Sequence, residues 1–226
     1  MIWERRRGPR TAPELREAYN RRHAGGLLRD RDRFYRMVRR RIPARAGAAL
    51  LDVGCGGGFL LREAEGLRAV GVEISDVALR EARRTAPAAG LVLAPGERLP
   101  FRDAAFDVVA CLGNLEHFLD PALGVREMAR VLRPSGEAWL LLPNSFYSGD
   151  LWRVLRTGYG PDHHQPVERF ATLCEWRDFL EAGGLRVVEV HPYNRFKWWK
   201  RLLPRALAYH FLYRARPSSR GTGDGP

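Results

Sequence analysis

Apolar runs and amphipathic stretches alternate along most of this chain of 226 residues. Residues 50–53 form a short apolar run, four glycines follow within positions 54–58, and residues 59–64 continue at helical spacing. This order predicts a buried strand, a glycine-rich loop and a helix, and similar patterns return farther along the chain. Further strands are predicted at 68–75, 105–111, 137–142, 185–190 and 206–214, and further helices at 14–22, 31–41, 76–84, 121–132, 150–156 and 173–182.

The glycine-rich loop indicates a ligand site. Glycine tolerates backbone angles that a Cβ atom would resist, and it lets a ligand approach the main chain closely. A dinucleotide fingerprint would require the spacing G-x-G-x-x-G, but Phe59 stands where its third glycine would be. The residues from Asp52 to Gly58 instead follow the pattern acid-x-Gly-x-Gly-x-Gly.

The second predicted strand ends in an acidic residue, Glu73. A carboxylate at a strand end can accept hydrogen bonds from both hydroxyl groups of a ribose. The alternative is that Glu73 caps the helix that begins at Asp76, and the two roles are compatible. The position therefore predicts the ribose contact of a nucleotide-like cofactor.

Together with the segments that follow them, these motifs resemble the class I S-adenosylmethionine-dependent methyltransferases, in particular the small type 11-like family. Residues 99–101 and 106–107 are similar to the family's adenine-side loop and the start of its fourth strand, and residues 182–190 to its last helix and strand. The resemblance covers residues 46–191 in order. It implies a Rossmann-like α/β fold with a seven-stranded, mostly parallel sheet, an antiparallel last strand beside the fifth, and helices on both faces.

The resemblance also implies S-adenosylmethionine as the cofactor. Relatives often carry Asp followed by Ala or Val where this chain has Gly96 and Glu97, so the implied adenine contact of Glu97 departs from the family's pattern. The implied cofactor-binding residues are Asp52, Gly54, Cys55, Gly56 and Gly58 for the methionine end and backbone, Glu73 with Ile74 for the ribose, Gly96 and Glu97 for the adenine, and Leu112 and Asn114 after the fourth strand.

The acceptor of the methyl group is expected at the same edge of the sheet. Ligands of open α/β sheets bind outside the carboxyl ends of the strands, so residues 113–118, 143–169 and 192–203 should converge over the cofactor. Methyl transfer needs the acceptor atom held in line with the leaving sulfur, and an oxygen acceptor is helped by a base such as His. The candidate bases are His117, His163 and His164. A structural role for His117 stays open, and so does a mechanism without a base.

The net charge of +12 lies at the two ends of the chain. Residues 1–45 carry fifteen arginines against five acids, and residues 192–226 carry eight basic residues against one acid, so the part between them is net negative. A binding partner is one explanation, and arginine-favouring codon usage is the other. Basic and aromatic side chains interleave in residues 195–203, which fits a lid over a small-molecule acceptor, a peripheral membrane contact or an RNA contact. Nucleic acid is the least favoured partner because no RNA-binding module accompanies the segment.

Cysteine usage and hydropathy predict a cytoplasmic protein. Cys55, Cys111 and Cys174 form an odd, scattered set that is typical of reduced thiols, and none has a His or Cys partner at zinc spacing, so no metal is expected. The first residues lack the apolar region of a secretory signal, and no apolar run reaches the roughly 18 residues of a membrane span. Peripheral contact with the inner membrane face through residues 195–203 stays open.

The sequence therefore predicts one methyltransferase domain with appendages, acting on a small-molecule or lipid-linked acceptor at oxygen, nitrogen or carbon. A non-catalytic binding or scaffold protein, an RNA methyltransferase and a nicotinamide oxidoreductase are the alternatives. The oligomeric state does not follow from the sequence. The expected parts are a basic N-terminal helical arm at 1–45 whose first 13 residues are loosely held, a cofactor-binding half at 46–142, an acceptor-site insertion with the C-terminal strands at 143–216, and a disordered tail at 217–226.

Overall fold

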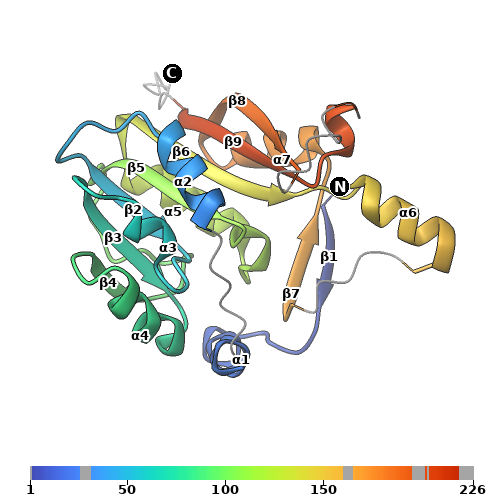
Figure 1. Cartoon of the computed structure of the whole chain (residues 1–226), viewed down its shortest axis with the longest axis horizontal. Helices are drawn as coiled ribbons and strands as arrows, with labels where there is room; N and C mark the ends of the chain where they lie inside the picture. Colours follow the sequence, from blue (N-terminus) through green and yellow to red (C-terminus); the bar gives the residue numbers. More distant parts are fainter. Residues whose placement is uncertain (1, 26–31, 160–164, 195–201, 203, 219–226) are drawn as a thin grey trace, which may run out of the picture.

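The computed structural model describes residues 2–25, 32–159, 165–194, 202 and 204–218 (Figure 1). Its main sheet has seven strands, which lie side by side in the order β4 (Gly90–Leu93), β3 (Arg68–Glu73), β2 (Ala49–Val53), β5 (Phe106–Leu112), β6 (Leu132–Pro143), β9 (His210–Pro217) and β8 (Leu185–Tyr193). Neighbours from β4 to β6 are parallel, whereas β9 runs antiparallel to both β6 and β8. The predicted Rossmann-like sheet with an antiparallel last strand is confirmed.

Helices cover both faces of this sheet because successive residues of a strand point to opposite faces. The α-helices are α1 (Ala12–Ala24), α2 (Asp32–Arg41), α3 (Phe59–Arg62), α4 (Asp76–Thr85), α5 (Pro121–Val131), α6 (Ser148–Thr157) and α7 (Leu173–Ala182). Leu50 of β2 packs in one apolar cluster with Val38 of α2. Its neighbour Leu51 packs in the opposite cluster with Met128 of α5 and Trp176 of α7. The core therefore has two layers, one on each side of the sheet.

Side-chain caps fix the points at which helices begin. The Ser75 hydroxyl accepts a hydrogen bond from the Ala78 N–H at the start of α4, and the Asp120 carboxylate caps α5 in the same way. Thr172 and Glu175 form a reciprocal capping box at the start of α7. Each cap satisfies N–H groups that a helix start leaves without an intrahelical partner. The segments that lead into α4, α5 and α7 are thereby held at the points where these helices begin.

The first residues of the chain are ordered, contrary to the expectation of a loosely held segment. Strand β1 (Trp3–Arg6) pairs antiparallel with β7 (Val167–Phe170) in a separate two-stranded sheet. An ion pair between Glu4 and Arg169 joins the two strands. The two residues stand 165 positions apart, so the local composition of the N-terminus gave no sign of this pairing.

Two predicted boundaries also differ. Strand β6 begins at Leu132 and includes residues 133–136, which the sequence indicates as a stop. The ladder with β5 jumps in register across these residues, so they form an irregularity within the strand. Pro217, assigned to the tail, ends β9, and residues 219–226 lie outside the described residues.

Candidate active site

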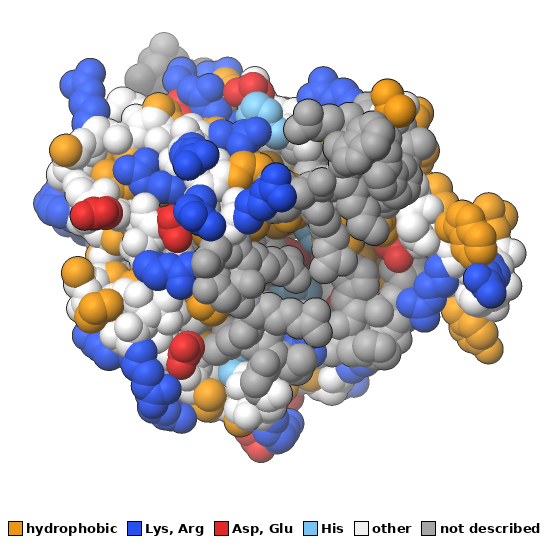
Figure 2. Space-filling view, viewed as in Figure 1, with side chains coloured by type: hydrophobic (Ala, Val, Ile, Leu, Met, Phe, Trp, Pro, Cys, Tyr) orange, Lys and Arg blue, Asp and Glu red, His pale blue; other side chains and the backbone are white. Residues whose placement is uncertain are grey.

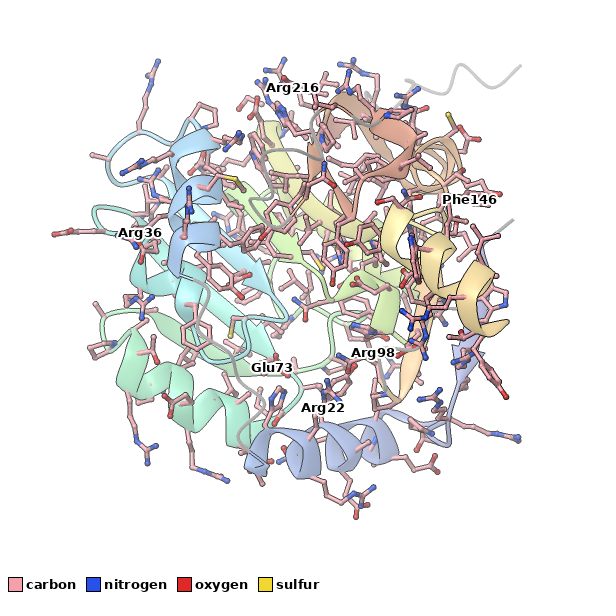
Figure 3. The ribbon with its side chains drawn as sticks, turned by 45° about the vertical axis from the view of Figure 1, so that its right-hand side comes forward. Arg22, Arg36, Glu73, Arg98, Phe146 and Arg216 are labelled. Atoms are coloured by element: carbon pink, nitrogen blue, oxygen red, sulfur yellow. The ribbon has the colours of Figure 1, made fainter. Side chains whose placement is uncertain are left out.

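The carboxyl ends of the parallel strands open into a cavity of about 470 Å³. Its walls come from β2, β3, β5 and β6, from α1, and from the loop that leads into α5. Figure 3 shows Glu73 at this edge and Arg22 on α1 below it, and both line the cavity. The predicted residues that line it are Asp52, Gly54, Cys55, Gly56, Glu73, Ile74, Gly96, Glu97, Leu112, Asn114 and His117.

The glycine-rich loop forms the floor of the cavity where β2 ends. Gly54 and Gly56 have positive φ angles of 75° and 51°, a region that favours glycine. A Cβ atom on Gly54 would lie 2.6 Å from Cγ of Asn114, whose amide donates to the Gly54 carbonyl oxygen at 2.8 Å. The loop is therefore locked to the end of β5 with room only for hydrogen. Because the glycines have no side chains, a ligand in the cavity can reach the backbone of the loop.

Gly58, a predicted cofactor contact, does not belong to the described lining of the cavity. It begins α3 with a φ of 78°, and a Cβ atom there would lie 3.0 Å from Cα of Ala82 in α4. The close approach of α3 and α4 is the reason that the structure gives for this glycine.

Two buried carboxyl groups line the cavity beside the loop. Glu73 accepts hydrogen bonds from the N–H groups of Gly56 (3.0 Å) and Ser75 (2.9 Å), which fix its orientation. Burial raises the pKa of Glu73, and burial together with the Glu73 charge raises the pKa of Asp52 to about 7. Each carboxylate oxygen of Glu73 can accept a second hydrogen bond. The pair therefore fits the ribose hydroxyls and the positively charged methionine end of S-adenosylmethionine.

Helix α1 is fastened across the end of β3. The Asn20 side chain accepts a hydrogen bond from the Ser75 hydroxyl at 2.7 Å and donates one to Asp76 at 2.7 Å. Arg16 forms an ion pair with the same Asp76 carboxylate. Because Ser75 is itself bonded to Glu73, the position of α1 is coupled to the predicted ribose contact. The N-terminal arm thus closes one side of the cavity.

Glu97 and Gly96 lie on the predicted adenine side. A Cβ atom on Gly96 would lie 2.2 Å from Cζ of Phe118, so this position also has room only for hydrogen. The Glu97 carboxylate accepts a hydrogen bond from the Leu119 N–H at 2.7 Å, and burial raises its pKa. Glu97 therefore holds the loop before α5, in addition to lining the cavity.

Glu116 and His117 also line the cavity and lie on the 3₁₀ turn η1 (Leu115–His117). Burial raises the pKa of Glu116 to about 8, and its Oε2 atom has no hydrogen-bond partner among the described residues. His117 Nδ1 lies 2.6 Å from the carbonyl oxygen of Val167, and its Nε2 lies 3.7 Å from Oε1 of Glu116. The histidine thus has a structural contact to β7 and also faces the cavity.

Residues from two distant parts of the chain complete this part of the lining. Tyr19 of α1 and Glu168 of β7 are both lining residues. The Tyr19 hydroxyl is buried and has no hydrogen-bond partner in the described part of the chain. Arg169 donates to carbonyl oxygens of η1 and of the loop after it, and it pairs with Glu4, so β1, β7 and this loop are joined around one guanidinium.

The structure therefore brings together most of the predicted site and adds residues that the sequence did not assign. Glu116 stands next to the predicted base His117. Its place in the predicted loop 113–118 after a strand was the sequence signal for it. Glu168 lies within the segment 143–169 that was expected over the cofactor, although it was not assigned a role, and Tyr19 is brought to the cavity by the packing of α1. The candidate bases His163 and His164 lie outside the described residues, as do residues 195–201 and 203 of the basic aromatic segment.

Comparisons with known proteins relate the chain to methyltransferases. Residues 51–140 match a family described as a methyltransferase domain. A ubiquinone biosynthesis O-methyltransferase of Aromatoleum aromaticum is 35% identical over 156 residues, which are 64% of this chain and 67% of that protein. A 27-O-demethylrifamycin SV methyltransferase of Amycolatopsis mediterranei is 33% identical over 176 residues, which are 70% of this chain and 62% of that protein. The matches thus span about two thirds of these relatives' length.

A solved structure shares the fold over nearly the whole chain. It is the 1,6-didemethyltoxoflavin-N1-methyltransferase of Burkholderia thailandensis with bound 1,6-didemethyltoxoflavin and S-adenosylhomocysteine. The TM-score is 0.64 at 20% sequence identity, and the match covers 96% of this chain and 95% of that one. At this identity the likeness shows the fold alone.

Proposed function

Since this chain belongs to the class I S-adenosylmethionine-dependent methyltransferases, we propose that it methylates a hydroxyl oxygen of a small molecule bound beside Glu116 and His117. The observation that carries the proposal is the cavity, which continues from Glu73 to these two side chains. The names of the two curated relatives specify methylation of oxygen, which favours oxygen over nitrogen and carbon. The nicotinamide alternative has no support from these comparisons.

The cofactor half of the cavity has the groups that the donor requires. Asp52 and the backbone at Gly54 and Gly56 would hold the methionine end, and Glu73 would hold the ribose hydroxyls. The bound cofactor supplies a methyl carbon on a sulfonium, which leaves as a neutral thioether when the new carbon–oxygen bond forms. The negative wall formed by Asp52 and Glu73 favours the cationic donor over that neutral product.

His117 is the proposed base. A carbonyl oxygen only accepts hydrogen bonds, so the short contact to Val167 places the ring proton on Nδ1 and the lone pair on Nε2. Nε2 would take the proton of the acceptor hydroxyl, and Oε1 of Glu116 lies 3.7 Å from this nitrogen. The Oε2 atom of Glu116 and the Tyr19 hydroxyl would hydrogen-bond the acceptor, since burial without a partner is costly for both groups.

The test is a comparison of His117→Ala with His191→Ala, a control in β8 whose imidazole is paired with Glu189. Each variant is assayed for transfer of labelled methyl to a panel of phenols, catechols and aliphatic alcohols, and to a second panel of aliphatic and aromatic amines. Loss of a general base should lower kcat by about 10² to 10⁴-fold in His117→Ala, with unchanged S-adenosylmethionine affinity. Full activity in His117→Ala would instead favour a mechanism that rests on proximity alone.

Wild-type turnover also decides between an enzyme and a non-catalytic binding protein. A wild type that binds S-adenosylmethionine but methylates no member of the panel, or only amines, would contradict O-methylation. Intact cofactor binding with no turnover on any acceptor class would favour the binding or scaffold alternative.

A further inference from the structure

Helix α6 extends away from the main sheet and packs on little of the protein (Figure 1). None of its ten residues is buried, and residues 152–159 are all exposed. An isolated helix of this length is marginal in water, and helices in proteins are stabilised mainly by packing of an apolar face. The helix therefore has no such packing within the described part of the chain.

The sequence of α6 nevertheless separates apolar from polar side chains. With 100° between successive residues, the apolar ones occupy one side of the helix and the polar ones the other. Leu155 is 88% exposed and Trp152 is 60% exposed on the apolar side. The apolar side consists of Leu151, Trp152, Val154 and Leu155, and the polar side of Asp150, Arg153, Arg156 and Thr157.

Exposed aromatic side chains also stand just before and just after the helix. Phe146, labelled in Figure 3 just before α6, is 52% exposed, and Tyr159 just after it is 73% exposed. Figure 2 shows hydrophobic side chains gathered on α6 at the right-hand end of the molecule. Single exposed apolar residues are common, but a contiguous patch marks an interaction surface.

The charges indicate what covers this surface. Arg156 borders the apolar side, with its guanidinium 5.3 Å from the Trp152 ring, and Arg153 lies on the polar side. A helix with Trp and Leu on one side and arginines on the other is typical of segments that lie in the surface of anionic membranes. The core of a protein interface is instead depleted of charge. None of the described helices is long and apolar enough to span a bilayer.

We infer that α6 is a membrane-surface helix, which buries Trp152 and Leu155 among the headgroups of an anionic bilayer while Arg156 contacts lipid phosphates and Arg153 faces the water. This site differs from the basic aromatic segment 195–203 that the sequence indicates. The inference rests on α6 alone and does not depend on the proposed methyl transfer.

The helix is firmly joined to the candidate active site. It follows Pro143, a lining residue of the cavity, through a four-residue link. The Asn144 amide in that link donates to the carbonyl oxygens of Ala206 (2.7 Å) and Ala208 (2.8 Å). The Tyr147 ring contacts the ring of Tyr209, another lining residue, with centroids 4.9 Å apart. A bilayer bound at α6 would therefore hold the cavity at a fixed distance from the lipid.

Cosedimentation with vesicles tests the inference. The full chain is mixed with vesicles of phosphatidylcholine, with and without phosphatidylglycerol, and compared with the double variant Trp152→Ser, Leu155→Ser. We expect the wild type to sediment only with the phosphatidylglycerol vesicles. Removing two apolar side chains that insert should weaken this binding by about tenfold or more. Because both side chains are exposed, the melting temperature should not change.

The matched control is Leu93→Ser, which removes an exposed leucine (43%) from β4, the strand at one edge of the main sheet. It should bind vesicles like the wild type. A wild type that never sediments with phosphatidylglycerol overturns the inference, and so does a double variant that sediments fully, because the basic ends would then carry the binding. Sedimentation velocity tests whether the face binds a second copy of the chain. A dimer that the two substitutions dissociate, without vesicle binding, would assign the face to a second copy of the chain.

Discussion

The two sides of the cavity are built in different ways. The cofactor side comes from the ends of neighbouring parallel strands, with Gly54 and Gly56 directly after β2 and Glu73 at the end of β3. The acceptor side comes from three distant segments, with Tyr19 on α1, Glu116 on η1 and Glu168 on β7. One side therefore depends on local sequence, and the other depends on how the N-terminal arm folds back.

The two sides also differ in how their acidic groups are satisfied. The Glu73 carboxylate already accepts two backbone hydrogen bonds, so its geometry is fixed before any ligand binds. Oε2 of Glu116 and the hydroxyl of Tyr19 are buried and have no hydrogen-bond partner within the described residues. Buried polar groups normally have partners. The comparison indicates a preformed cofactor side and an acceptor side that a ligand completes.

The largest expected effect separates the two glutamates. Glu73→Ala should weaken S-adenosylmethionine binding by about 1 to 3 kcal/mol, because hydrogen bonds to a charged group are lost. Glu116→Gln should leave this affinity unchanged within about threefold, since a change well below 1 kcal/mol is expected for a group that does not touch the cofactor. Calorimetric titration measures both. Equal losses in the two variants would show that the two sides do not act separately.

The next effect concerns the guanidinium that joins the distant segments. Arg169→Met should lower the free energy of unfolding by about 1 to 3 kcal/mol, because several carbonyl oxygens and Glu4 lose a charged partner. Urea unfolding measures this loss. The control is Arg133→Met, which removes a half-exposed partner of Asp107 and should cost less than 1 kcal/mol. A smaller loss for Arg169 than for Arg133 would contradict the role of β1 and β7 in holding the acceptor side.

The difference between the two sides also explains what the sequence could predict. The apolar run at 50–53 and the helical spacing of the residues after the glycines are local, so this strand and helix followed from them. The cofactor loop was equally readable, because the positive φ angles of its glycines are a property of each position. Gly58 was the exception. It does not belong to the described lining of the cavity, and a glycine is required there because α3 and α4 approach each other closely.

The individual residues of the acceptor side could not be predicted from local sequence. Strand β1 is four residues long and rich in arginine, and its pairing with β7 depends on a partner 165 positions away. The exposure of α6 is equally a property of the whole fold. Its amphipathic pattern predicted a helix correctly, but the same pattern would also fit a helix packed on the protein. Periodicity shows that a face is apolar and does not show what covers it.

A further effect is expected in the pH dependence of stability. The pKa of Glu116 is raised by burial from an ordinary 4.5 to about 8, so the folded protein keeps a proton that the unfolded chain has lost between those values. The free energy of unfolding should therefore fall as the pH rises from about 5 to 8, by up to about 1 kcal/mol per pH unit. Glu116→Gln cannot titrate and should flatten the curve. Asp52, with a pKa raised to about 7, keeps the remaining slope in both proteins.

The smallest effect tests whether the N-terminal arm stabilises the cofactor side as well. Asn20 of α1 and Arg80 of α4 both hydrogen-bond Asp76, but only Asn20 also contacts Ser75, the neighbour of Glu73 in the hydrogen-bond chain. Asn20→Ala should weaken S-adenosylmethionine binding by about 0.5 to 1 kcal/mol, as expected for one hydrogen bond. Arg80→Ala should have no measurable effect, because it removes an exposed helical pair. If both variants bind the cofactor like the wild type, the cofactor side is independent of the arm, and only the acceptor side depends on how the N-terminus folds back.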